Sequence, residues 1–221
     1  MRTWLRDHGL LLANAALFAF SFVGMALAGG RAYNADQTEH GERTVSLGAY
    51  LGSGHFIEAT FENWESEFLQ MGMYVVLTAF LFQRGSSESK PIEGHAPQDD
   101  DPRDADLRRS DIPWPVRRGG LVLRIYEHSL ALLFLILFLA SFLLHLTGGA
   151  TAYSEEQQAH GAAPVTAWEF LRTSQFWFES FQNWQSEFLA VAVIVGASVY
   201  LRQRGSAESK PVAEPHHTTG A

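Results

Sequence analysis

Cysteine is absent from the 221-residue chain. This absence excludes disulfide bonds, thiolate metal sites and cysteine nucleophiles. Charged side chains are missing from two long segments, residues 8–28 and 129–146, which contain no Asp, Glu, Lys or Arg. Each segment is long enough to cross a hydrocarbon core of about 30 Å as a helix. We therefore expect both segments to be transmembrane helices.

Two shorter segments, residues 68–82 and 188–201, also lack charged side chains. A helix over the first of them reaches only about 22 Å, so both helices are expected to begin upstream. The sequence thus predicts an all-α integral membrane protein with four transmembrane helices. A signal peptide is a poorer interpretation of residues 8–28, because a segment of the same kind recurs inside the chain.

The second half of the chain repeats the first half at one constant offset. FENWESEFL at residues 61–69 recurs as FQNWQSEFL at 181–189, and QRGSSESKP at 83–91 recurs as QRGSAESKP at 203–211. This pattern indicates an internal duplication. Each copy has an even number of predicted crossings. We therefore expect two parallel two-helix repeats, each with an amphipathic outer helix extension.

The distribution of charge predicts the orientation of the helices. Most Lys and Arg residues lie beside one set of predicted helix ends, whereas the opposite connectors are mainly acidic. By the positive-inside rule, both termini and the middle linker are expected in the cytoplasm. No basic surface with interleaved aromatic residues suggests a nucleic-acid partner, so the expected environment is the lipid bilayer.

Four segments follow from these patterns. The first repeat is predicted at residues 1–85, a cytoplasmic linker at 86–120, the second repeat at 121–205 and a cytoplasmic tail at 206–221. The linker combines prolines, glycines and mixed charges. Such a composition cannot build a core, so disorder is expected. Trp114, Arg117 and Arg118 are expected to return the linker to the membrane surface.

The duplicated pattern resembles a family of bacterial multi-pass membrane proteins that carries only a domain-of-unknown-function label. The resemblance covers essentially the full chain and is most specific at NWQSEFL and QRGSxESKP. It implies an integral protein of the bacterial inner (plasma) membrane. It transfers no established activity.

The repeated aromatic phrase has two distinct faces when it is placed on a helix. One face carries aromatic residues that suit a membrane interface: Phe61, Trp64 and Phe68, and Phe181, Trp184 and Phe188. The other face carries a polar cluster: Asn63, Ser66 and Glu67, and Asn183, Ser186 and Glu187. Glu67 and Glu187 are expected at equivalent depths, near the outer boundary of the hydrocarbon core.

Two interpretations of the polar cluster remain open. The cluster can tie helices together at a hydrated interface. Alternatively, paired Glu and Asn side chains can line a vestibule that admits protons or cations. A catalytic pair of carboxylates is less favoured, because no nucleophile or metal set accompanies the two Glu residues.

The histidines allow further interpretations. Asp36 with His40, and Glu156 with His160, lie four residues apart and could each supply two metal ligands. The glycines that follow, Gly41 and Gly161, equally suit the end of a short external helix.

Three other histidines lie near the predicted membrane helices. His8 and His128 occupy equivalent starts of two of these helices, and His145 lies towards the end of the second apolar segment. They could act as axial haem ligands or simply lie in the polar interface. No metal or cofactor site is assigned from these patterns.

The leading functional hypothesis is a small cation or proton conduit with a Glu/Asn outer vestibule. One alternative is a non-catalytic accessory or scaffold subunit, with a membrane-protein partner or a second copy of the chain. The other alternative is a haem or metal redox protein. The chain has no Walker loop, Rossmann fingerprint, H-E-x-x-H or G-x-S-x-G motif. An enzyme is therefore not expected.

Overall fold

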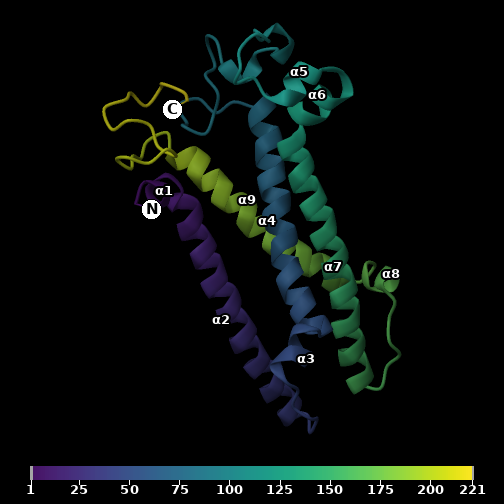
Figure 1. The fold of residues 1–221 in the computed structure, drawn as a ribbon. Coiled ribbons are helices and arrows are strands. Elements are labelled where there is room, and N and C mark those ends of the chain that lie inside the picture. Colours follow the sequence, from purple (N-terminus) through teal and green to yellow (C-terminus); the bar gives the residue numbers. More distant parts are fainter. Residues whose placement is uncertain (1, 221) are drawn as a thin grey trace. The chain divides into compact units, whose positions relative to one another are not determined.

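The computed structural model describes residues 2–220, and helices take up most of them (Figure 1). No strand occurs within this described part of the chain. The long helices are α2 (Gly9–Glu39), α4 (Gly54–Phe80), α7 (Ser129–Ala159) and α9 (Ser174–Ala197). The short elements are α1 (Arg2–Asp7), α3 (Leu47–Leu51), η1 (Pro97–Asp99), η2 (Pro102–Asp104), α5 (Trp114–Arg118), α6 (Gly120–Glu127) and α8 (Ala167–Phe170). The all-α prediction is confirmed.

Two of the long helices are long and apolar enough to cross a membrane, namely α2 and α7. Each begins one residue after a histidine, His8 or His128. α4 and α9 include the whole of the repeated aromatic phrase and begin before it, at Gly54 and Ser174. The expectation that these helices begin upstream of their apolar segments is therefore confirmed.

The expected short external helix does not form before Gly41 or Gly161. Instead, α2 and α7 continue to Glu39 and Ala159. No proline interrupts residues 29–39, so the backbone hydrogen bonds of α2 run on unbroken. Gly41 then adopts a φ of 76°, and the Glu42 N–H donates to the Gln37 carbonyl at 2.7 Å. This bond closes the last turn of the long helix.

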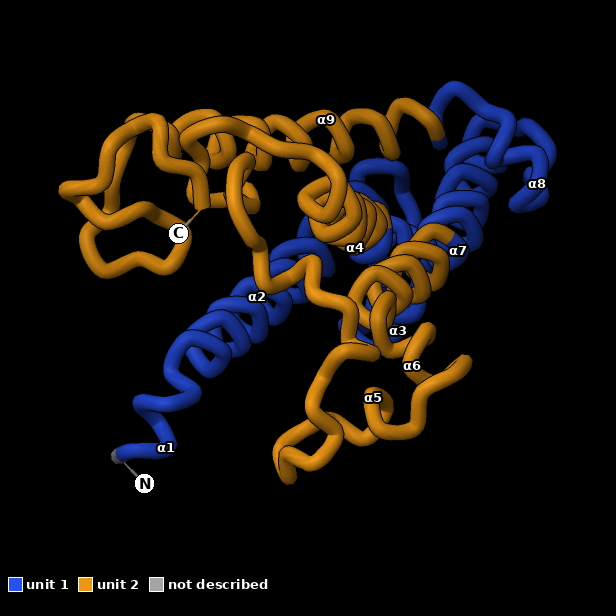
Figure 2. Tube along the Cα trace, turned by 90° about the horizontal axis from the view of Figure 1, so that it is seen from above, with its two compact units in different colours: residues 1–61, 143–176 blue, residues 62–142, 177–221 orange. Residues whose placement is uncertain are grey.

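The chain divides into two compact units (Figure 2). The first unit comprises the residues up to 61 together with 143–176, and the second comprises 62–142 together with 177 onward. α4, α7 and α9 each have residues in both units.

In the first unit, an aromatic cluster packs between α2 and the start of α4. Tyr50 is buried, and its ring lies 5.5 Å from that of Tyr33 and 5.4 Å from that of Phe56. Gly30 makes room for it, because a Cβ there would lie 3.3 Å from the Tyr50 ring. A second cluster surrounds Phe170, which is fully buried and lies 5.6 Å from the Phe176 ring.

The connectors after α2 and α7 are held to their helices in the same manner. The Asn34 side chain bonds both the N–H and the carbonyl of Val45, at 2.7 and 2.9 Å. The Ser154 hydroxyl bonds both groups of Val165, at 3.0 and 3.1 Å. These bonds satisfy backbone groups that would otherwise lie half-buried without a partner.

The linker at residues 86–120 contains η1, η2 and α5 joined by turns. Its polar contacts include local ones, such as the Arg109–Asp111 ion pair at 2.6 Å, and distant ones, such as that between the Ser86 and Ser198 hydroxyls at 2.8 Å. The Arg109 guanidinium holds the pKa of Asp111 below its usual value. Exposed pairs of this kind contribute little to stability. The disorder of this linker therefore stays a prediction.

Glycine also allows α4 and α7 to approach closely in the first unit. A Cβ at Gly148 would lie 2.7 Å from the Ile57 Cγ2 and 2.8 Å from the Glu58 backbone nitrogen. A Cβ at Gly54 would lie 2.8 Å from the Ala152 nitrogen. Backbone atoms cannot move aside as a side chain can, so these positions tolerate only glycine.

We predict that Gly148→Ala destabilises the protein. Overpacking costs about 1–3 kcal/mol, which outweighs the gain of about 1 kcal/mol in helix propensity. Gly24→Ala is the matched control, because a Cβ at Gly24 meets no atom within 4 Å. The control should gain about 0.5–1 kcal/mol. Unfolding in mixed detergent micelles measures both, and shifts in the same direction would contradict the assigned contact.

Candidate functional site

A row of polar side chains runs along α4 at every fourth position. We call these residues the α4 polar row: Glu62, Ser66, Gln70, Tyr74 and Thr78. Residues at this spacing form one continuous ridge that is inclined to the helix axis. Ser66 and Gln70 are buried, with 2% and 7% of their surface exposed, and the other members are half-buried.

The apolar residues of α4 show the opposite pattern of exposure. Met71, Met73, Val76, Leu77 and Phe80 are all exposed, and Phe80 retains 75% of its accessible surface. A helix in a water-soluble protein buries its apolar stripe and exposes its polar one. Along its second half, α4 therefore shows the reverse arrangement, with apolar side chains exposed and polar side chains buried or half-buried.

At one end of the row, two carboxylates of α4 bond side chains of α9. The Asn183 side-chain amide donates to the Glu62 carboxylate. The Trp184 indole N–H donates to the Glu65 carboxylate at 3.1 Å. Glu65 is fully buried. Hydrogen bonds to the carboxylate reduce the cost of its burial.

One turn earlier on α9, Ser180 has an unused hydroxyl. Only 1% of Ser180 is exposed, and its Oγ has no hydrogen-bond partner among the described residues. Ser180 shares a helix face with Asn183 and Trp184, which lie three and four residues later. The face of α9 that bears these donors thus retains capacity for a further hydrogen bond.

The polar residues expected from the repeat are only partly brought together. Ser66 and Ser186 donate to the carbonyls of Asn63 and Asn183 within their own helices, at 2.7 and 2.8 Å. The carboxylates of Glu67 and Glu187 lie close enough to interact electrostatically.

The members of this expected cluster differ in exposure. Asn63, Glu67 and Ser186 are exposed, whereas Ser66 is buried.

Glu62 and Glu65 are not among the site residues expected from the sequence. The two copies do not share them, because the corresponding positions of the second copy hold Gln182 and Gln185. The signal that could have revealed them was therefore the difference between the copies.

The expected interfacial aromatic residues pack against one another along their helices. Trp64 and Phe68 make an edge-on contact at 6.3 Å, and Phe181 and Trp184 make one at 5.5 Å. Phe181 and Phe188 are exposed and Phe61 is half-buried. Trp184 has the additional role of donor to Glu65.

The other end of the row opens into a pocket of about 960 Å³. Tyr74 and Thr78 line this pocket, and the Tyr74 hydroxyl donates to the Glu88 carboxylate at 2.7 Å. Lys90, Asp99 and residues of the C-terminal tail complete the wall. The row therefore connects a pair of buried or half-buried carboxylates to a pocket that is lined by Glu88 and further carboxylates.

The C-terminal tail is held at this pocket by several hydrogen bonds. Lys210 is buried and donates to the carbonyls of Pro215, His216 and Thr218. The Gly220 N–H donates to the Ser86 carbonyl at 3.0 Å.

The candidate metal-binding histidines bond their own helices instead. His40 Nδ1 lies 3.0 Å from the Asp36 carbonyl oxygen, and His160 Nδ1 lies 2.9 Å from that of Glu156. The bond to this carbonyl, together with the nearby Asp36 carboxylate, raises the pKa of His40 above its usual value. No group of three potential ligands occurs within residues 2–220.

The candidate haem ligands lie in different surroundings. His8 and His128 are exposed, and the His8 ring lies 4.9 Å from that of Trp4. His145 is fully buried and stacks on Phe176 at 4.8 Å.

A family model described as Domain of unknown function (DUF6766) matches residues 1–221. The chain belongs to this family. The expected resemblance to a family that carries only such a label is thus confirmed. No curated protein and no solved structure matches the chain. Membership of DUF6766 assigns no activity, so a function has to be argued from the residues themselves.

We predict that Trp184→Phe destabilises the protein by about 1–3 kcal/mol, because it removes a donor to a buried carboxylate. Trp168→Phe is the control, since Trp168 is exposed and contacts Arg172 through its ring face. The control should change stability by less than about 1 kcal/mol. Thermal unfolding measures both variants. Equal losses would mean that the Trp184–Glu65 bond contributes nothing specific.

Proposed function

We propose that this protein spans the membrane with four helices and conducts protons along the α4 polar row. Two observations support a membrane location for α2 and α7. Both are long apolar helices, and only 6% and 11% of the residues in their most apolar windows are buried. Apolar surface exposed on this scale is stable in lipid and not in water.

The observation that carries the proposal is the reversed exposure of apolar and polar side chains on α4. The apolar residues of its second half are exposed, as lipid-facing residues are, while its polar row is buried or half-buried. Polar and ionisable residues within membrane helices usually face the interior of a bundle and mark ion or proton pathways. In this proposal α4 and α9 also span the membrane, in addition to α2 and α7.

The row has the length that a pathway requires. From Glu62 to Thr78 the helix rises about 24 Å, which approaches the thickness of the hydrocarbon core. Successive members lie one turn apart, with about 6 Å between their Cβ atoms. Single water molecules can bridge such gaps. The pathway would begin at Glu62 and Glu65 and end in the pocket at Glu88.

Protons fit this pathway better than metal cations. Between Glu65 and the pocket, the row offers hydroxyls and an amide but no carboxylate. A dehydrated cation would have few charged ligands there, whereas a chain of hydroxyls and water can pass a proton from group to group. Glu67 and Glu187 would add negative potential at the outer entrance, which corresponds to the predicted vestibule.

The second copy supports a specific role for the row. Ala190 and Ile194 occupy the positions that correspond to Gln70 and Tyr74. A row that served only to tie helices together would be expected in both copies. The proposed orientation follows the positive-inside rule, with both termini, the linker and the pocket at Glu88 in the cytoplasm of a bacterial cell.

We predict that Glu62→Gln and Glu65→Gln each reduce proton flux into proteoliposomes at least about tenfold, since an amide, unlike a carboxylate, cannot take up a proton at the entrance to the row. Each variant keeps an oxygen that accepts the bond from α9, so folding should be retained. These substitutions also introduce the residue that the second copy carries. Glu39→Gln, at the exposed end of α2, is the control for loss of one negative charge and should leave the flux unchanged.

The wild-type protein supplies the decisive comparison. If reconstituted wild-type protein shows no proton flux above that of empty liposomes at any pH or voltage, the conduit proposal fails. The accessory-subunit alternative would then be favoured, and co-purification of a stoichiometric membrane partner would test it. If the flux persists in both Gln variants, protons do not pass along the α4 polar row.

A further inference from the structure

The two QRGSxESKP loops are built from the same hydrogen bonds. In the first loop the Gln83 N–H donates to Ser89 Oγ at 3.1 Å, and in the second the Gln203 N–H donates to Ser209 Oγ at 2.9 Å. The serine that follows the glycine accepts from a glutamate N–H at 3.1 Å in both loops. Gly85 and Gly205 have φ values of 84° and 85°. The loops therefore present the same groups to their surroundings.

In the first loop, two of these groups form hydrogen bonds with oxygen atoms elsewhere in the chain. The Gly85 N–H donates to the Thr219 hydroxyl oxygen at 2.9 Å. The Ser86 hydroxyl lies 2.8 Å from the Ser198 hydroxyl. The glycine N–H and the serine hydroxyl of this loop can therefore both bond to oxygen atoms.

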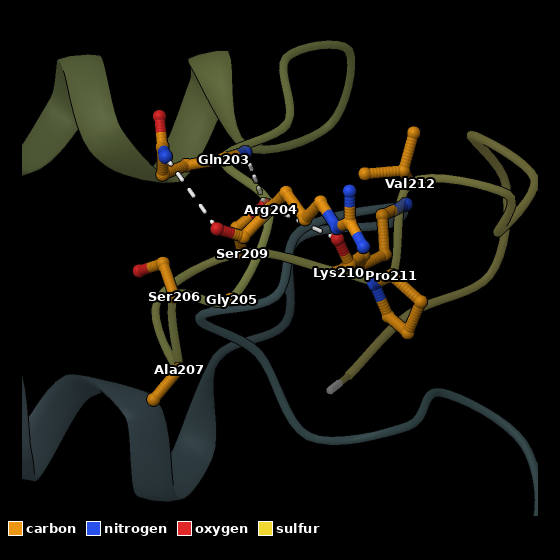
Figure 3. A pocket seen from close by; sticks show the side chains of 9 residues that line it. All are labelled: Gln203, Arg204, Gly205, Ser206, Ala207, Ser209, Lys210, Pro211 and Val212. Atoms are coloured by element: carbon orange, nitrogen blue, oxygen red, sulfur yellow. Dashed lines mark hydrogen bonds between the residues drawn. The ribbon is translucent and has the colours of Figure 1, made fainter.

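In the second loop, the equivalent groups are open. Among the described residues, the Gly205 N–H has no hydrogen-bond partner. Within residues 2–220, the Ser206 hydroxyl accepts only from the Glu208 N–H, so its own proton is available. Both residues line a pocket of about 780 Å³, together with Arg204 and Lys210 (Figure 3).

The charged side chains that line this pocket are basic. It contains Arg204 and Lys210 but no Asp or Glu. This is unusual in a chain with a net charge of −8, and it contrasts with the pocket at Glu88, which contains Glu88, Asp99 and Glu214. The Lys210 ammonium is committed to three carbonyls, so the exposed Arg204 guanidinium is the cation available to a ligand.

We propose that the second QRGSxESKP loop binds a phosphate group. The Gly205 N–H and the Ser206 hydroxyl replace their missing oxygen partners with phosphate oxygens, and Arg204 neutralises the charge. The source can be the headgroup of an anionic lipid or free phosphate. The lipid source rests on the proposed membrane location, because basic sites at the cytoplasmic surface bind such headgroups.

The test follows the amide resonances of Gly205 and Gly85 in full-length, detergent-solubilised protein. The protein is titrated with inorganic phosphate, with short-chain phosphatidylglycerol and, for comparison, with sodium chloride at matched ionic strength. The Gly205 resonance should shift and saturate, whereas the Gly85 resonance should not. Arg204→Gln should weaken binding about tenfold, since it removes a charge-assisted contact. Arg84→Gln, the same change in the first loop, should leave binding intact.

Each outcome has a distinct meaning. Saturation by phosphatidylglycerol alone identifies a lipid headgroup, and saturation by inorganic phosphate identifies free phosphate as sufficient. The proposal is overturned if neither ligand saturates, if chloride produces the same shift, or if Gly85 responds as Gly205 does. The measurement involves no proton flux, so it stands or fails independently of the conduit.

Discussion

A helix that exposes its apolar residues and covers its polar ones constrains every other feature of this protein. In water such an arrangement would expose large hydrophobic side chains and bury hydroxyls and carboxylates at a cost. In a bilayer the same arrangement is stable, provided that each covered polar group has a partner. Glu62 and Glu65 obtain such partners from Asn183 and Trp184. The contacts between α4 and α9 are therefore a condition for the polar row.

In the proposed membrane location, close backbone contact is the second requirement, since lipid would provide no hydrophobic drive for helices to associate. Gly54 and Gly148 let α4 and α7 approach in the first unit, and Gly72 does so beside Phe134 in the second, where a Cβ would lie 3.1 Å from the Phe134 Cβ. At the loops, the QRGSxESKP motif fixes a turn that either binds the tail or remains open. The motif thus serves structure in the first copy and offers a site in the second.

Much of the fold could be predicted from periodicity and composition, because uncharged segments of membrane length and a helical aromatic stripe are local properties. The ends of α2 and α7 were misplaced, since nothing in residues 29–39 breaks a helix. The partners of Glu62 and Glu65 could not be predicted, because they depend on which face of α9 meets α4. The carboxylates shared by the two copies are Glu67 and Glu187, whereas the carboxylates that accept the interhelical bonds, Glu62 and Glu65, are replaced by Gln in the second copy.

Substituted cysteines test the central claim most directly, namely that the α4 polar row is hydrated within the membrane. The chain contains no cysteine, so each introduced thiol is observed without background. In proteoliposomes, Gln70→Cys and Tyr74→Cys should react with a small water-soluble methanethiosulfonate, because only a thiol in contact with water forms the reactive thiolate. Met71→Cys and Val76→Cys, on the exposed apolar side, should remain unreacted. The reverse pattern would contradict the account, because it would place water against the apolar face and exclude it from the row.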